Sequence, residues 1–332
     1  MKKNSGYFPH LSRYVCFAIF VWIANLAYSQ NSLEIVEPYR NPIVFCRTHY
    51  DEITGEVTRS SKLWVMEEDG TRLVQLTFGS QYDDHPSFYS DQRRVLYSEF
   101  AGDELDRATE AKLISIDIYT GERVVILEES GKALHHATIS PIGDDLIVYN
   151  KDTIDRRSEW FGLPPNDYEI DILASNGVAV APGSVVFMHE KNRGLVNREV
   201  SLAQVSGKGL NASVTVLTDG NHLHRRPAVS PDGDLLAWQS NAGSKSDEIR
   251  LADIGGRNPT NITTSPGNDG HPWFSRDGEW IVFESDRTAG WVTGNGCDLR
   301  TGCEIWKLNV KTGEQVQLTS GGKKYVSNRP RM

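Results

Sequence analysis

His-Pro-Trp-Phe-Ser-Arg-Asp-Gly at positions 271–278 is one of several copies of a single phrase in this chain. Close copies stand at 85–91 (His-Pro-Ser-Phe-Tyr-Ser-Asp) and 226–233 (Arg-Pro-Ala-Val-Ser-Pro-Asp-Gly), and a looser one, His-Ala-Thr-Ile-Ser-Pro-Ile-Gly, at 136–143. A short apolar run follows each copy. Repetition at intervals of about 40–50 residues is typical of stacked supersecondary units. The repeat therefore decides the fold.

The sequence around each copy defines the rest of the unit. A threonine stands nine residues before three of the repeat prolines: Thr77 before Pro86, Thr218 before Pro227 and Thr263 before Pro272. Upstream of these threonines, apolar runs such as 62–66 and 73–76 are joined by turns that contain glycine. This pattern indicates β-hairpins. Each unit is therefore predicted to have four antiparallel strands, like one blade of a β-propeller.

The two ends of the repeat region complement each other. Residues 327–332 read as the first strand of a blade, and residues 41–46 read as the second strand of a blade. Pairing of these strands would close the ring and leave no open sheet edge. We therefore predict an all-β, six-bladed β-propeller, closed by its N- and C-terminal strands, as a single domain over 30–332. Residues 168–188 fit two assignments, since 178–183 reads either as the last strand of the third blade or as the first strand of the fourth.

The first 29 residues have the pattern of an export signal. Basic residues (Lys2, Lys3 and Arg13) flank or precede the apolar run 14–24, and small residues precede Gln30. This run is shorter than the roughly 20 residues that span a bilayer. A cleaved signal peptide over 1–29 is predicted, with an uncleaved anchor as the alternative. The predicted location is periplasmic or secreted.

Charge and cysteines narrow the partners. Removal of residues 1–29 takes away three basic and no acidic residues, so the net charge of −9 becomes −12. An acidic protein repels nucleic acid, so nucleic acid is not an expected partner. We also expect a monomer, and no segment of the mature chain that spans a membrane. Cys297 and Cys303 flank a polar loop and are predicted to form a disulfide in an oxidising compartment, with a metal site as the alternative. Cys46 lies in an apolar strand and is predicted to be a buried free thiol.

The residue before each repeat proline, or its aligned equivalent, is polar in five units. These residues are His85, His136, Arg226, His271 and Arg329, with Gly177 at the aligned position of the irregular fourth unit. Because this position lies where one blade leads into the next, the side chains are predicted to meet at one mouth of the central channel. Asp83, Asp269 and His224 occupy a second ring position.

Two interpretations of these residues remain open. In the first, His85, His136, His224, Arg226, His271 and Arg329 bind an anionic ligand, and Asp83, His85, Asp269 and His271 are candidate ligands of a divalent metal ion. In the second, the same side chains only tie the turns between blades to the backbone. The long insertions 48–61, 100–111, 151–167 and 285–302 are expected on the same face, where loops of this length often carry recognition. Lys323, Lys324, Arg329 and Arg331 form a basic patch that lies by the channel mouth and is expected to be solvated.

The nine-residue spacing, the Pro-x-Phe-Ser-x-Asp-Gly phrase at 272–278 and Glu304-Ile305-Trp306 resemble the repeat of the TolB-type (PD40 or WD40-like) β-propellers. TolB itself resembles a propeller preceded by a small domain, for which residues 30–40 leave no room. The resemblance implies an interaction module that binds a protein or carbohydrate ligand at the channel mouth. The alternative is a metal-assisted uronic-acid polysaccharide lyase, with channel histidines in metal or base roles and Arg226 and Arg329 on substrate carboxylates. No Gly-x-Ser-x-Gly elbow, P-loop or dinucleotide fingerprint is present.

Overall fold

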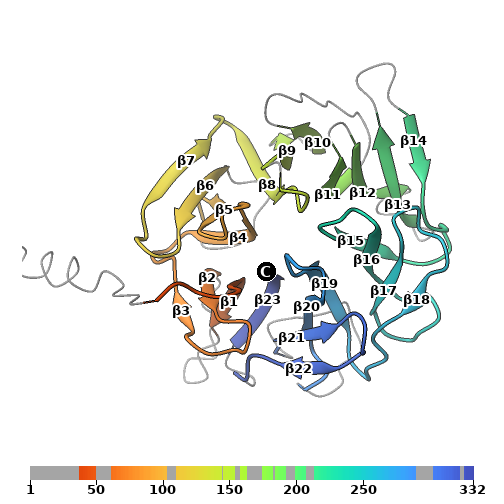
Figure 1. The fold of residues 1–332 in the computed structure, drawn as a ribbon. Coiled ribbons are helices and arrows are strands. Elements are labelled where there is room, and N and C mark those ends of the chain that lie inside the picture. Colours follow the sequence, from red (N-terminus) through yellow and green to blue (C-terminus); the bar gives the residue numbers. More distant parts are fainter. Residues whose placement is uncertain are drawn as a thin grey trace, which may run out of the picture.

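The structure is a computed structural model that describes residues 37–49, 61–102, 110–143, 145–153, 158–162, 174–181, 184–191, 199–206, 213–288, 302–321 and 325–332. The predicted signal peptide and Cys297 lie outside these ranges, as do large parts of the four long insertions. The described residues form β-strands arranged as a ring of sheets around a central axis (Figure 1). None of them forms a helix of the length and apolar character needed to cross a membrane.

Four of the sheets have four strands each. The first has the order β23 (Tyr325–Arg331), β1 (Ile43–His49), β2 (Lys62–Met66), β3 (Val74–Gln75). The next has the order β11 (Ala174–Ala181), β12 (Ser184–Lys191), β13 (Glu199–Ser206), β14 (Ser213–Val216). The remaining two are β15 (His224–Val229), β16 (Leu235–Ser240), β17 (Glu248–Asp253), β18 (Thr260–Asn261), and β19 (Asp269–Phe274), β20 (Trp280–Ser285), β21 (Glu304–Asn309), β22 (Gln315–Gln317).

The fifth sheet has seven strands. It contains β4 (Tyr82–Phe88), β5 (Arg94–Phe100), β6 (Ala111–Asp117) and β7 (Arg123–Leu127), together with β8 (Lys132–Ile139), β9 (Ile147–Thr153) and β10 (Ser158–Gly162). The two groups are joined by one parallel residue pair, Ala111 with Ala133. The structure therefore has five blades, and the predicted count of six is wrong. The physical reason is that two repeat units meet at small alanine side chains, where β6 and β8 come close enough to share one sheet.

The predicted closure of the ring is confirmed. Strands β1 and β23 pair antiparallel, with Val44 opposite Arg331 and Cys46 opposite Asn328. The C-terminal end of β23 points to the centre of the ring (Figure 1). Cys46 is a free, fully buried thiol, as the sequence predicts.

The ambiguous segment 178–183 belongs to the beginning of a unit. Strand β11 lies at one edge of its sheet, and the fully exposed β14 lies at the other edge. Val178 packs in the largest core cluster with residues from other blades, including Met66 and Trp238. Strand β11 is therefore the innermost strand of its blade, which settles the choice in favour of the first strand of the fourth unit.

The nine-residue spacing has a hydrogen-bonding cause. In four sheets the repeat threonine hydroxyl accepts a hydrogen bond from a backbone N–H of the third strand: Thr77 from Leu63 at 3.0 Å, Thr218 from Leu202 at 2.8 Å, Thr263 from Ile249 at 2.8 Å and Thr319 from Ile305 at 2.9 Å. This bond fixes the point at which the chain leaves the outermost strand. The connection from there to the innermost strand of the next unit therefore has a constant length, which explains the nine-residue spacing.

The Ser-x-Asp-Gly part of the phrase forms the turn after the innermost strand. The Ser275 hydroxyl donates to Asp277 at 2.5 Å and accepts the Trp280 N–H at 2.9 Å. Gly278 has a φ of 73°, a conformation that glycine adopts without steric cost. Ser230, Asp232 and Gly233 repeat the arrangement. The turn residues thus set the register of the apolar strand that follows.

Candidate binding site in the central channel

The residue before each repeat proline has an unusual backbone. Its φ is positive in all five polar copies: 50° at His85, 52° at His136, 54° at Arg226, 47° at His271 and 52° at Arg329. For residues other than glycine this left-handed conformation costs roughly 1–2 kcal/mol. The strand register shifts at the same place in each innermost strand, as in a β-bulge. A bulge redirects a side chain, and five innermost strands use it at the same position.

The bulged residues of different blades converge. His85, His136, Arg226 and His271 line one small cavity of about 10 Å³, together with Thr138, Val178, Pro227, Pro272 and Arg331. The rings of His85 and His136 have centroids 4.0 Å apart, and the Nδ1 atoms of His135 and His136 are 2.7 Å apart. The structure therefore brings four of the six predicted ligand-binding residues to one cavity.

Arg329 lies beside this cavity and is held by Asp84. Its Nη1 donates to Asp84 Oδ1, and Asp84 Oδ2 lies 2.9 Å from His85 Nδ1. The Asp84 carboxylate is fully buried and also accepts the His85 N–H at 2.9 Å. Burial disfavours its ionisation, but the charge of Arg329 and the contacts with His85 outweigh burial and hold the pKa of Asp84 below its usual value. Asp84 is therefore a buried anion that fixes two ring residues.

Glu284 on β20 is the second buried anion of the channel. Its Oε1 lies 2.7 Å from His271 Nδ1 and 3.8 Å from Arg226 Nη1, and its Oε2 accepts the Arg329 N–H at 2.8 Å. Arg226 also donates to the side-chain oxygen of Gln239 at 2.5 Å. One carboxylate thus links three of the five bulged positions.

His85 and His271 are neutral at pH 7. Burial, with a contribution from the charge of Arg329, lowers the pKa of His85 to about 3 although Asp84 acts in the opposite direction. Burial and the nearby arginines lower the pKa of His271 well below its ordinary value. Both rings therefore act as neutral hydrogen-bonding groups, and the positive charge of the channel comes from guanidinium groups.

Arg331 lines the channel cavity, whereas the sequence interpretation placed it in a solvated patch by the mouth. Its guanidinium carbon lies 4.4 Å from the Trp273 ring centroid, and its Nη1 donates to the Pro330 carbonyl at 2.7 Å. The residue is only 9 % exposed, so the expectation of a solvated patch is wrong for Arg331. Burial lowers the pKa of Arg331 to about 10. The signal that could have located it is its place two residues after Arg329, on a strand whose bulge turns both side chains inward.

Asp83 and Asp269, at the second ring position, pair with neighbouring side chains of the protein. The Asp83 carboxylate lies 3.1 Å from Lys62 Nζ, and burial raises the pKa of Asp83 to about 6. Asp269 accepts from Arg287 at 2.7 Å and from the Ser285 hydroxyl at 2.6 Å. These partners occupy the carboxylates, so Asp83, His85, Asp269 and His271 do not fit a single metal site.

His224 also lies in a separate cluster. Trp238 Nε1 donates to His224 Nδ1 at 3.0 Å, and His224 Nε2 lies 3.2 Å from Asp219 Oδ1. Because an indole nitrogen is only a donor, Nδ1 must accept, and the proton of a neutral His224 is on Nε2 facing Asp219. Asp219, His222 and His224 are the one group of potential metal ligands within 4.8 Å of each other among the described residues. A metal ion on Nε2 would have to displace that proton. The hydrogen bonds therefore favour a structural role, in which His224 links Trp238 to Asp219.

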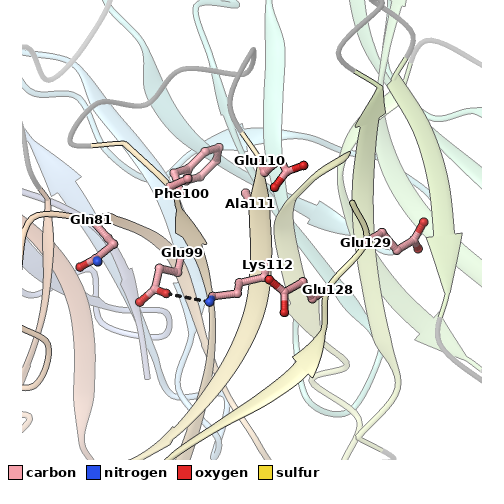
Figure 2. A pocket seen from close by; sticks show the side chains of 9 residues that line it. Gln81, Glu99, Phe100, Glu110, Ala111, Lys112, Glu128 and Glu129 are labelled. Carbon is pink, nitrogen blue, oxygen red and sulfur yellow. Dashed lines mark ion pairs between the residues drawn. The ribbon is translucent and has the colours of Figure 1, made fainter. Parts of the chain in front are cut away.

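A larger pocket lies away from the channel. It has a volume of about 260 Å³ and is lined by β5, β6 and the connection between β7 and β8, with the carboxylates of Glu99, Glu110, Glu128 and Glu129 (Figure 2). Lys112 Nζ lies 3.6 Å from Glu99, and Arg123 contacts the same carboxylate. None of the site residues singled out by the sequence lines this pocket.

The position of the long loops agrees with the sequence interpretation where their ends are described. The predicted insertions fall between the second strands β1, β5, β9 and β20 and the third strands β2, β6, β10 and β21, but 151–167 is wrong as an insertion in part, because β9 runs to Thr153 and β10 lies within it. Since neighbouring strands are antiparallel, these loops emerge on the face where the innermost strands begin. The predicted disulfide between Cys297 and Cys303 involves a residue outside the described ranges and stays a prediction.

The fold and the channel define the class as an all-β propeller with a polar, arginine-rich axis. No protein-family model and no curated protein matches the chain. Solved structures do match. TolB from Acinetobacter baumannii has a TM-score of 0.64 at 15% identity, over 93% of this chain and 70% of that chain. A putative TolB from Agrobacterium tumefaciens has a TM-score of 0.60 at 13% identity, over 87% and 98%.

Hydrazine synthase from Kuenenia stuttgartiensis also matches, with a TM-score of 0.60 at 9% identity, over 89% of this chain and 46% of that chain. The TolB structures and this chain share their blade architecture. The chain therefore has the fold of the TolB-type β-propellers, as its repeat indicates. At these identities the likeness concerns the fold alone.

Proposed function

We propose that this protein is an exported binding module that recognises an anionic group of a protein or carbohydrate ligand at its channel mouth. The observation that carries the proposal is the repeated bulge, which places His85, His136, Arg226 and His271 around one cavity despite its conformational cost. Strain that recurs at one inward-facing position is typical of functional sites. Pairing with Lys62 and Arg287 explains Asp83 and Asp269, whereas the bulged arginines and histidines are held by Asp84 and Glu284 beside the cavity.

Export is the part of this proposal that rests on sequence. Residues 1–29 have the basic and apolar pattern of a signal peptide, and the predicted location is periplasmic or secreted. The acidic overall charge and the basic channel also fit together. A net negative surface repels anions in general, so an anionic ligand would be bound by the local field of the channel and by loop contacts around it.

The first experiment is a calorimetric titration of the mature protein with acidic peptides and with oligogalacturonides. We expect saturable binding of one of these ligand classes, weakened at least tenfold in Arg226→Gln, because a guanidinium that contacts the ligand carboxylate is removed. Arg257→Gln is the matched control, since the Arg257 side chain is 79% exposed and its partner, Asp253, lies near it on the outer part of a blade. Absence of binding in all titrations of a folded protein would contradict the proposal.

The lyase hypothesis requires turnover of a uronic-acid polymer with a metal ion and formation of an unsaturated product. The channel histidines His85 and His271 face Asp84 and Glu284, and the carboxylates of Asp83 and Asp269 are occupied by Lys62 and Arg287. This arrangement favours binding over a metal-assisted reaction. A metal-dependent release of unsaturated sugars, lost in His271→Ala, would support the enzyme instead.

A further inference from the structure

We propose that the channel cavity holds one small monovalent anion, a halide or a single carboxylate, with Arg331 as its cationic anchor. This inference deepens the proposed function and rests on the same site, because it names the group that the channel recognises. The observations that carry it are the charges of the channel, the buried donors without acceptors and the size of the cavity.

The three arginines of the channel are not equally paired. The guanidinium groups of Arg226, Arg329 and Arg331 surround the cavity or its edge, and the two buried side-chain carboxylates there are those of Asp84 and Glu284. Asp84 and Glu284 are within 4.0 Å of Arg329 and Arg226 respectively, whereas no side-chain carboxylate in the described part of the chain is that close to Arg331. Arg331 is therefore the guanidinium of the three that has no side-chain carboxylate partner among the described residues.

The donors of this region point to the same conclusion. Arg331 is 91 % buried, and its Nε has no hydrogen-bond acceptor among the described residues. The Nε of Arg329 is likewise buried without an acceptor. A buried charged donor without a partner is strongly unfavourable, because it has lost its water without gaining a protein contact. An anion next to Arg331 would satisfy both its charge and its free N–H.

The size of the cavity selects the class of anion. About 10 Å³ corresponds to the space that one water molecule occupies. One oxygen of a carboxylate has this size and a single-atom halide comes near it, whereas a tetrahedral sulfate or phosphate has four oxygens and does not fit. Val178, Pro227 and Pro272 form the apolar part of the wall and leave the arginines as the contacts for charge. The site therefore selects a small monovalent anion over a dianion.

The same chemistry has two sources, a free inorganic anion or the carboxylate of a larger ligand. Thermal unfolding of the mature protein in bromide, formate or sulfate, at constant ionic strength set with a bulky sulfonate salt, tests the anion itself. Glucuronate and N-acetyl-glutamate amide distinguish the sources. Stabilisation by bromide or formate alone assigns a free anion, and stronger stabilisation by a carboxylate on a sugar or amino acid assigns a ligand group.

We expect bromide or formate to raise the unfolding temperature in a saturable manner, and sulfate to have no such effect. Arg331→Gln should abolish the saturable shift, Arg331→Lys should retain part of it, and Arg257→Gln should leave it unchanged. A shift that Arg331→Gln retains, or no saturable shift with any small anion, would overturn the inference. If peptide or glycan binding persists in that case, the proposed function stands and only the anchor is wrong; if anions bind but no larger ligand does, the reverse holds.

Discussion

Two positions on the same innermost strands, two residues apart, behave in opposite ways. On β4, Asp83 is held by Lys62, while His85 turns toward the channel. On β19, Asp269 is held by Arg287 and Ser285, while His271 lines the cavity. The difference between the two positions is the bulge, since only the second has a positive φ and a register shift. The backbone conformation thus separates the acids that pair with Lys62 or Arg287 from the histidines that line the channel cavity.

Asp84 is the residue whose loss should affect this arrangement most. Asp84→Ala removes the buried partner of Arg329 and leaves its guanidinium uncompensated, so the free energy of unfolding should fall by about 3–5 kcal/mol. Urea denaturation of the variant and the wild type measures this loss. Asp69→Ala, at an exposed turn, serves as the control and should change stability by under about 1 kcal/mol. A loss at Asp84 no larger than that of the control would show that the ring is not held by this ion pair.

The neutral state of the channel histidines predicts a pH dependence. The pKa of His85 is about 3 in the folded protein, below the unfolded value of about 6.5, so the unfolded chain binds more protons between these values. The stability from this group is present above pH 6.5 and is lost as the pH falls, by about 2 kcal/mol at pH 5. His271 acts in the same direction.

His85→Asn should flatten this slope. Asp83 contributes the opposite slope, because its raised pKa of about 6 makes stability fall as the pH rises from about 4 to 6. Asp83→Asn should therefore make the acid-side loss steeper. Unfolding free energies of the three proteins between pH 4 and 8 give the comparison, and identical slopes would refute the assigned roles.

A smaller effect is expected at the second ring position. Trp238→Phe removes the donor to His224 Nδ1 and should cost about 1–1.5 kcal/mol. It should also raise the pKa of His224, because Nδ1 becomes free to accept a proton and Asp219, which faces Nε2, stabilises the resulting imidazolium. NMR titration of the His224 ring signals measures this change, with Trp280→Phe as the control. An unchanged pKa would mean that the indole does not fix the tautomer.

The sequence predicted the ring closure because the terminal segments are recognisable halves of one unit. It also predicted which residue of each copy reaches the channel, since the position before the proline recurs. The sequence did not show that Asp83 and His85 have different roles. The partners of Asp83 and Asp269, Lys62 and Arg287, lie outside the repeated phrase, so the phrase alone does not predict these contacts. The predicted number of blades was wrong because Ala111 pairs with Ala133 and joins two units into one sheet. A single backbone pair between two units cannot be recognised from the repeat pattern.

Arg331 shows the same limit. Its charge suggests solvent, and only the partner strand β1 and the Trp273 ring reveal that it is buried. Glu284 likewise follows an apolar run and has no distinctive neighbour in sequence, although it links three ring positions. Contacts between units, unlike the strands themselves, depend on residues far apart in the chain.

The most direct test compares the unfolding free energies of Arg329→Gln and Arg331→Gln in a buffer of a bulky sulfonate without small anions. Arg329 neutralises Asp84, so its loss should cost about 3–5 kcal/mol. No side-chain carboxylate of the described residues pairs with Arg331, so its replacement removes an uncompensated buried charge and should cost clearly less than the replacement of Arg329. Equal, large losses for the two variants would mean that the channel charge is already balanced, and the account of an anion-binding axis would be contradicted.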